Sequence, residues 1–329
     1  MLTSSAEETA GAWSHSAIRT LQMCSEEFSE TSTENEVFYE GATEVRAYGL
    51  RVESEVPLPL PAFEGGTGRT IVRITEGKVQ FPSGADGNVA AENGSLYLRI
   101  SNVGTFRIDG TSVTADRSDS ASNWNLSTAL LGRVLPALLY SRGYLVVHGS
   151  AAAIGEAGVA IIGFKTSGKS SLAAGLYDAG HRAVADDVIV VNFDGGPSLV
   201  PSFPRLKLAE PTLGALDLSE NAGDPSKEWW FPVDDGFEST PVSLDSIFIL
   251  EESADAASPS VAPVAPRTAM EALLRHAGSV DVVKATQTER RHFWECARVA
   301  EAADVKRLCR PDNLLQLPEL ARTVENALE

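Results

Sequence analysis

The chain of 329 residues lacks the features that mark several specialised classes of protein. Its three cysteines, Cys24, Cys296 and Cys309, are too few and too scattered for a disulfide framework or a cysteine metal site. No apolar run approaches the ~20 residues that span a bilayer. Residues 1–16 lack the basic and apolar regions of a signal peptide. We therefore expect a cytoplasmic protein with reduced thiols and no membrane partner.

Basic residues, and lysine above all, are also scarce. Lys and Arg total 27 against 45 Asp and Glu, which gives a formal net charge of −18, and with 7 Lys the number of Arg is 27 − 7 = 20. Non-specific nucleic-acid binding requires a basic surface, so we expect no nucleic-acid partner. An acidic, lysine-poor surface suits a cytoplasm of high salt, and it is equally typical of an acidic protein from a GC-rich genome. A hydrophobic content of 43% is sufficient for a large core.

Two regions precede the part of the chain that carries the motifs. Residues 1–35 are rich in Ser, Glu and Thr and predict a mobile acidic tail or a peripheral helix. Residues 36–122 predict a β-rich region, because short apolar runs alternate with Gly, Asn and Asp clusters as in an antiparallel meander. The expected strands are 45–52 (ended by a run of prolines), 70–74, 95–100, 104–108 and 112–114.

Residues 123–329 predict an α/β domain. Residues 123–141 have a helical pattern that Pro136 should break or kink. The Ala, Pro and Ser composition of 254–266 predicts a flexible link, and 217–240 has the composition of a loop. The other expected elements are strands at 246–251 and 305–309 and helices at 267–277, 284–302 and 315–328.

Residues 163–170 read Gly-Phe-Lys-Thr-Ser-Gly-Lys-Ser, which is the pattern G-x-x-x-x-G-K-[ST]. Two apolar runs, 144–153 and 158–162, precede this segment and predict a β-hairpin. Residues 171–179 predict a helix that Gly180 ends. A strand, a glycine-rich loop and a helix in this order form the context in which the pattern binds phosphate.

The chemistry of this loop follows from the start of its helix. Backbone N–H groups there have no helical partner, and the helix dipole favours negative charge. Lys169 is expected to neutralise β- and γ-phosphate oxygens, and the Ser170 hydroxyl is a hard oxygen ligand for Mg²⁺. ATP and Mg²⁺ are thus the predicted cofactors. The expected nucleotide-binding residues are Gly163, Phe164, Lys165, Thr166, Ser167, Gly168, Lys169, Ser170 and Ser171.

Two sets of acidic residues compete for the role of the catalytic acid or base. Asp186 and Asp187 precede an apolar run, whereas Glu251 ends an apolar strand, as the metal-associated acid does in ordinary P-loop ATPases. We favour the aspartates, because one could hold Mg²⁺ while the other accepts the proton of an attacking hydroxyl. His148, in the strand before the hairpin turn, is either a structural residue or part of this site.

Three cations complete the set of candidate site residues. Arg205, Lys207 and Lys227 could bind a phosphate or an anionic substrate. Alternatively, each of the three is an ordinary surface cation with no role in the site.

The combination of His148-Gly149, the loop at 163–170 and Gly180-His-Arg-x-Val-Ala-Asp-Asp187 resembles the catalytic domain of HPr kinase/phosphorylase. It is still more similar to the HPr kinase-related serine kinases, some of which act in lasso-peptide gene clusters. The resemblance covers 145–191 and extends to 204–208 and 242–250.

This resemblance implies a P-loop kinase core related to phosphoenolpyruvate carboxykinase and an ATP-dependent serine kinase. It makes Asp187 the general base and Asp186 its companion on the metal side. It places His148 beside the transferred phosphoryl group. Because HPr kinases assemble as oligomers, it also allows a homo-oligomer.

The chain departs from the family pattern in two places. True HPr kinases have a Glu-Met-Arg-Gly stretch after the aspartate pair, whereas this chain has Phe203-Pro-Arg205-Leu and lacks the Glu. That puts a second metal site and phosphorylase activity in doubt. The first 140 residues do not resemble the HPr kinase regulatory domain, so HPr is not assigned as the acceptor.

The expected acceptor is a serine-type hydroxyl of a peptide, a protein or a small molecule. Two other functions stay open from the sequence. The chain could be a nucleotide-gated regulatory module, or a P-loop ATPase that uses Glu251.

Overall fold

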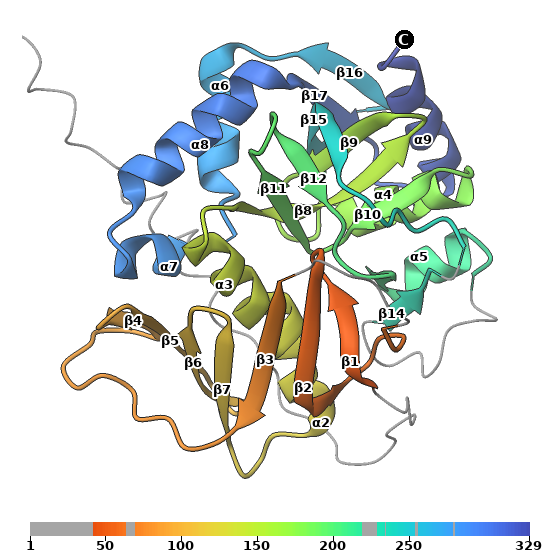
Figure 1. The fold of residues 1–329 in the computed structure, drawn as a ribbon. Helices are drawn as coiled ribbons and strands as arrows, with labels where there is room; N and C mark the ends of the chain where they lie inside the picture. The colour runs from red at the N-terminus through yellow and green to blue at the C-terminus, as the bar shows by residue number, and fades with distance from the viewer. Residues whose placement is uncertain (1–41, 64–69, 219–228, 234, 254–255, 279) are drawn as a thin grey trace, which may run out of the picture. The chain divides into compact units, whose positions relative to one another are not determined.

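The computed structural model has a mixed α/β fold with several sheets (Figure 1). It describes residues 42–63, 70–218, 229–233, 235–253, 256–278 and 280–329, all within one compact unit. The predicted tail at 1–35 lies outside the described residues. Within these ranges, no helix combines the length and the apolar character needed to cross a membrane.

A seven-stranded sheet occupies the N-terminal part of the described chain, with the order β1-β2-β3-β7-β6-β5-β4. The strands β4 to β7 form the expected antiparallel meander, but β3 runs parallel to both β2 and β7, so the expectation of antiparallel pairing throughout was wrong. The strands are β1 Ala42–Ala47, β2 Leu50–Leu58, β3 Ile71–Glu76, β4 Val89–Glu92, β5 Ser95–Ile100, β6 Gly104–Asp109 and β7 Ser112–Arg117.

The single strand predicted at 45–52 is instead the tip of the β1–β2 hairpin. Tyr48 and Gly49 form a two-residue turn in which both have positive φ, 52° and 70°, as the turns that match strand twist require. The Tyr48 N–H donates to Ser202 O at 2.7 Å. A contact with a distant segment therefore stabilises a left-handed conformation that a bulky residue seldom adopts.

The helical segment at 123–141 consists of α2 Asn123–Ala129, a π-helical turn η1 Leu130–Val134 and α3 Leu135–Ser141. The irregularity expected at Pro136 is a π turn that ends at Val134, and Pro136 itself lies in the first turn of α3. The Leu135 N–H donates to Leu130 O, and Pro136 has no N–H to offer. Leu131 O accepts a bond from the Tyr48 hydroxyl at 3.0 Å instead.

Apolar side chains of the first sheet and of this helical segment share one core. Along β2, buried and more exposed residues alternate, as in a strand with one covered face. Val52 and Phe106 of the sheet pack in the same cluster as Leu131, Leu135 and other residues of α2, η1 and α3. In Figure 1 these helices lie against the sheet. The β-rich region thus contributes to the core next to the candidate site.

The second sheet has eight strands. Five of them pair in a closed ring, in the order β8, β9, β15, β12, β11 and back to β8. The strands β8 and β9 are antiparallel, which confirms the predicted hairpin. Both β9 and β17 lie parallel to β15. The strands are β8 Leu145–Ile154, β9 Ala157–Ile162, β10 Arg182–Ala185, β11 Val188–Asn192, β12 Ser198–Val200, β15 Val242–Glu252, β16 Ser260–Pro263 and β17 Asp304–Arg310.

Helices pack against this sheet, and their contacts with it form two separate apolar clusters. One cluster includes Leu172 of α4 and Leu320 of α9, and the other includes Leu273 of α6 and Val299 of α8. Figure 1 shows α4 with α9 beside each other, and α6 with α8 in another part of the fold. The helices are α4 Lys169–Asp178, α5 Glu210–Ala215, α6 Pro266–Arg275, α7 Val280–Ala285, α8 Glu289–Ala302, η3 Leu314–Gln316 and α9 Leu317–Asn326.

Three other expectations need correction. The predicted link at 254–266 contains β16, which pairs with β17. The predicted loop at 217–240 contains β14 Trp229–Pro232, which pairs with β13 Arg205–Leu208 in a two-stranded sheet. The single helix predicted at 284–302 is α7 followed by α8.

Candidate active site

The loop at 163–170 leads from β9 into α4, as its sequence pattern predicts. Thr166 and Gly168 both have left-handed backbones, with φ of 67° and 98°. A change of handedness in consecutive residues lets backbone N–H groups converge on an anion. A Cβ at Gly163 would lie 2.7 Å from Leu250 O of the neighbouring strand. The first glycine of the motif is therefore required by close packing of the backbone.

Lys169 is buried, with 6% of its surface exposed. Its Nζ donates to Gly163 O at 3.1 Å and to Phe164 O at 2.8 Å. Burial of an ammonium group is costly unless its donors are satisfied, and these loop carbonyls satisfy part of that demand. The positive charge therefore lies within the loop that the motif predicts to bind phosphate.

Asp186 and Asp187 lie between β10 and β11, which pair with the same edge of β8. Asp187 has a left-handed backbone with φ of 66°, a conformation that aspartate tolerates better than most residues. Its carbonyl accepts from the Gly149 N–H at 3.3 Å. A Cβ at Gly149 would lie 2.5 Å from Ile161 O, so glycine permits this close approach of backbones.

The carboxylate of Asp186 is buried and bonded on both oxygens. Oδ1 accepts from the Ser150 hydroxyl at 2.6 Å, and Oδ2 accepts from the Lys207 N–H at 2.6 Å. Ser170, the second residue of α4, also acts to lower the pKa of Asp186. Burial raises the pKa of Asp186 and the Asp187 charge adds to the rise, while these hydrogen bonds oppose it. Asp186 therefore connects β8 to β13.

Asp187 is more accessible and lies beside His148. The Asp187 side chain is 45% exposed, and His148 Nδ1 lies 2.8 Å from Asp187 O and 3.5 Å from Asp187 Oδ1. Burial lowers the pKa of His148, with Asp187 opposing this shift and Lys169 adding to it. The imidazole is thus neutral near pH 7, and the carbonyl contact assigns its proton to Nδ1.

An open cavity of about 390 Å³ borders the aspartate pair. The turn of the β1–β2 hairpin and the π turn form part of its wall, and the rings of Tyr48 and Phe203 pack edge to face at 5.7 Å. Burial, followed by the charges of Asp187 and Asp186, raises the pKa of Tyr48, so its hydroxyl stays protonated. The lining residues are Tyr48, Thr128, Gly132, Asp186, Asp187, Val188, Phe203, Arg205 and Lys207.

The remaining candidate residues separate into three groups. Arg205 and Lys207, on β13, both line this cavity, and Arg205 is buried. Lys227 lies outside the described residues. Glu251 is the next-to-last residue of β15, beside the P-loop strand, where it pairs with Arg307 at 3.3 Å and is 45% exposed. The structure therefore brings the aspartates, His148 and the loop together, and it leaves Glu251 in a solvated ion pair.

The sequence analysis missed two residues that contact this site. His276 follows α6, accepts the His148 N–H on its carbonyl at 2.8 Å and packs edge to face on Phe164. Burial lowers the pKa of His276 to about 4. Arg310, at the end of β17, donates to Ser167 O at 2.7 Å. Both lie more than 100 residues from their partners, and no local pattern in the sequence distinguishes them.

The oxygen donors at the site fit a magnesium ion held mainly by phosphate and water. The Ser170 hydroxyl, which acts to lower the pKa of Asp186, and the Asp186 carboxylate are both hard oxygen donors that could hold the ion. In the part of the chain that the structure describes, no group of three or more His, Cys, Asp or Glu could hold a metal ion. Mg²⁺ sites in proteins usually take one or two carboxylates together with substrate phosphates.

Comparison with known proteins shows a distant similarity to HPr kinase/phosphorylase over part of the chain. No family model matches. The HPr kinase/phosphorylase of Chlorobium phaeobacteroides (strain BS1) is 41% identical over 59 residues, which are 18% of this chain and 17% of that protein. The HPr kinase/phosphorylase of Prosthecochloris aestuarii (strain DSM 271 / SK 413) is 42% identical over 59 residues, with the same shares. The chain thus matches less than a fifth of the length of these relatives.

The chain also aligns with solved structures. The HPr(Ser) kinase/phosphatase from Coxiella burnetii matches with a TM-score of 0.30 and 15% identity over 56% of this chain and 95% of that one. The sequence matches confirm the resemblance that the motifs indicated.

Proposed function

We propose that this protein is an ATP-dependent kinase that phosphorylates a serine-type hydroxyl of a peptide, a protein or a small molecule. Residues 123–329 would form its P-loop kinase domain, of the HPr kinase type, and residues 36–122 a β-rich region that helps to form the acceptor site. The observation that carries the proposal is that β8 joins the phosphate-binding motif to the paired carboxylates. Gly149 of β8 pairs with Ile162, the residue before the loop, and its N–H donates to Asp187 O at 3.3 Å. A chance match to the motif would not require this arrangement.

The two aspartates differ in burial and bonding, which supports different roles for them. Asp186 is buried with both oxygens bonded, so it suits a metal-side ligand that needs little movement. Asp187 is half exposed at the cavity and has a neutral histidine beside it. It therefore suits a base that receives a proton from an entering hydroxyl.

In the proposed reaction, Lys169 and the loop amides bind the β- and γ-phosphates, and Ser170 and Asp186 would hold Mg²⁺, which would supply charge that neutralises the phosphates. The acceptor oxygen forms a bond to the γ-phosphorus as the bond to the bridging oxygen of ADP breaks. The hydroxyl proton passes to Asp187. The positive charges of Arg205 and Lys207 at the cavity favour an acceptor with an anionic group nearby.

The test is phosphoryl transfer from labelled ATP to free serine, to a peptide that ends in serine, and to HPr. The Asp187→Asn variant should abolish transfer and still bind ATP with Mg²⁺, because the loop is intact. The Glu251→Gln variant serves as the control and should keep activity. Loss of activity in Glu251→Gln alone would favour the ATPase. ATP binding without transfer or hydrolysis would favour the regulatory module.

A further inference from the structure

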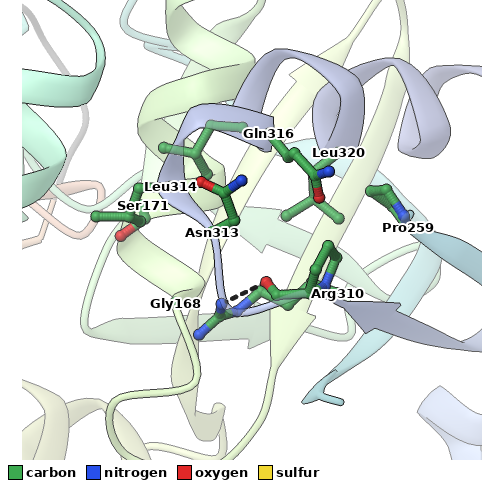
Figure 2. Close-up of a pocket in the computed structure, with 10 residues that line it drawn as sticks. Gly168, Ser171, Pro259, Arg310, Asn313, Leu314, Gln316 and Leu320 are labelled. Atoms are coloured by element: carbon green, nitrogen blue, oxygen red, sulfur yellow. Dashed lines mark hydrogen bonds between the residues drawn. The ribbon is translucent and has the colours of Figure 1, made fainter. Parts of the chain in front are cut away.

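A second recess, separate from the acceptor cavity at Asp187, lies beside the phosphate-binding loop (Figure 2). Its lining includes Gly168, Arg310 and Gln316. It has room for about one water molecule, which is too little for a further ligand. The feature that points to a further partner lies instead on the outer surface, on α8.

The outward face of α8 carries two exposed aromatic side chains. Trp294 is 57% exposed and Phe293 is 47% exposed, and their rings pack edge to face at 5.9 Å. They are two of the five large apolar side chains that are exposed in the described part of the chain. An apolar pair on an otherwise polar face is typical of a surface that another molecule covers. The buried residues of α8 lie on its other side and are His292, Glu295, Cys296 and Val299.

Four residues of the outward face lie along one line of the helix, which we call the α8 seam. They are spaced by four, three and four residues, as in the seam along which two helices pack, and they are Arg290, Trp294, Ala297 and Glu301. At 3.6 residues per turn, this line is opposite the buried residues. Arg290 and Glu301, at its two ends, are exposed and form no ion pair with another described residue.

The α8 seam is complementary to itself. In an antiparallel pair of α8 helices, a two-fold axis midway along the seam brings each residue opposite the one at the same distance beyond the axis. Arg290 then faces Glu301 of the second copy, and Trp294 faces Ala297 of the second copy. A single register therefore joins opposite charges at both ends and sets a large side chain against a small one in the middle. A parallel pair would instead bring the two Arg290 side chains together.

The charge around the α8 seam also permits two copies to approach. Residues 266–302, which contain α6, α7 and α8, have six Lys and Arg against five Asp and Glu, so their formal charge is 6 − 5 = +1 in a chain of −18. A net charge far from zero opposes association through repulsion. This repulsion is weak where the local charge is near zero, and the α8 seam lies in such a segment.

We infer that two copies of this chain associate through the α8 seam, as an antiparallel pair with two-fold symmetry. Trp294 and Ala297 supply the apolar contact, and Arg290 and Glu301 set the register. Exposed ion pairs contribute little, and one helix from each copy makes a small interface. The dimer is therefore weak and depends on protein concentration. The inference does not depend on the proposed kinase activity.

Sedimentation velocity of the full chain, from micromolar to submillimolar concentration, tests this inference. The unmodified protein should change from monomer to dimer as the concentration rises. Arg290→Glu alone, or Glu301→Arg alone, sets like charges opposite each other at both ends of the seam and should raise the dissociation constant roughly tenfold or more. The double variant Arg290→Glu/Glu301→Arg should recover association, because each charge again faces its opposite. This recovery also shows that the exchanged residues leave the chain folded.

Two tryptophan variants test the apolar contact. Trp294→Ala should remain a monomer at concentrations where the unmodified protein is a dimer. Trp124→Ala is the matched control, because Trp124 is 40% exposed and lies on α2, outside the seam, and it should associate normally. An unmodified protein that stays a monomer throughout would overturn the inference and leave the α8 face to a different protein. Normal association by Trp294→Ala, or no recovery in the double variant, would overturn it as well.

Discussion

Replacement of Arg310 with alanine should disturb the phosphate-binding loop more than the fold as a whole. The Arg310 side chain is 10% exposed, and its Nε, Nη1 and Nη2 donate to Ser167 O at 2.7 Å, Pro311 O at 2.9 Å and Glu252 Oε2 at 2.6 Å. A Cβ placed on Gly168 would lie 3.0 Å from Arg310 Nε. Arg310 therefore holds the loop backbone directly at the glycine that precedes α4.

The size of the effect follows from these contacts. Removal of the guanidinium leaves Ser167 O without this donor, and such a loss costs ~1–3 kcal/mol. The pair with Glu252, which is 45% exposed, adds little because water screens it. If about 2 kcal/mol appears as disorder of the loop, ATP affinity should fall roughly 30-fold. Calorimetric titration with ATP and Mg²⁺ measures this change, and urea unfolding measures the effect on the fold.

Arg307→Ala is the matched control on the same strand. Arg307 pairs with Glu251 at 3.3 Å, and both side chains are nearly half exposed, so the loss should be ~1 kcal/mol or less. Arg310→Lys keeps the charge but not the three directed bonds, and it should recover only part of the affinity. Normal ATP binding by Arg310→Ala together with weak binding by Arg307→Ala would refute the reasoning and point to Glu251 as the acid at the nucleotide.

Three further predictions concern other parts of the described chain. Tyr48→Phe removes the donor to Leu131 O and should lower the free energy of unfolding by ~1–2 kcal/mol; because Tyr48 lines the acceptor cavity, KM for the acceptor should rise while ATP affinity, measured by calorimetry, stays the same. Gly149→Ala places a Cβ 2.5 Å from Ile161 O and should cost ~1–3 kcal/mol in urea unfolding; an unchanged midpoint would contradict the close packing. Burial lowers the pKa of His292 to about 4. The contribution of the neutral imidazole to the free energy of unfolding is therefore complete above about pH 6.5 and is lost as the pH falls through about 4. In His292→Gln, the loss of stability between pH 7 and pH 4 should be smaller by up to ~3 kcal/mol, and an identical loss in both proteins would show that His292 does not titrate this way.

The parts of the site that local sequence determines were predictable. The loop at 163–170, the hairpin before it and the helix after it form from neighbouring residues, so the glycines and the apolar runs were sufficient. The carboxylates at 186 and 187 were recognised by type and spacing, but only the structure shows that Asp186 accepts from Ser150 and from the Lys207 N–H. Whether these residues act as proposed stays a prediction.

The parts that depend on distant contacts were not predictable. Tyr48 sits in an unbroken strand-like pattern, and its turn is stabilised by a bond to Ser202, which no local signal reveals. The strand β16 has the composition of a linker, and it forms because β17 offers an edge for pairing. Arg310 reaches Ser167 from 143 residues away. Pairing partners and register of this kind are set by tertiary packing, which outweighs local preference.

The turn at Tyr48 has an evolutionary consequence if the kinase proposal holds. The tip of a hairpin from the N-terminal sheet forms part of the acceptor wall, whereas the nucleotide machinery belongs to a separate stretch of the chain. Residues at that tip can therefore diverge to admit new acceptors without altering the residues that handle ATP. A lineage of such proteins could acquire new targets by remodelling one loop, with the phosphate chemistry inherited unchanged.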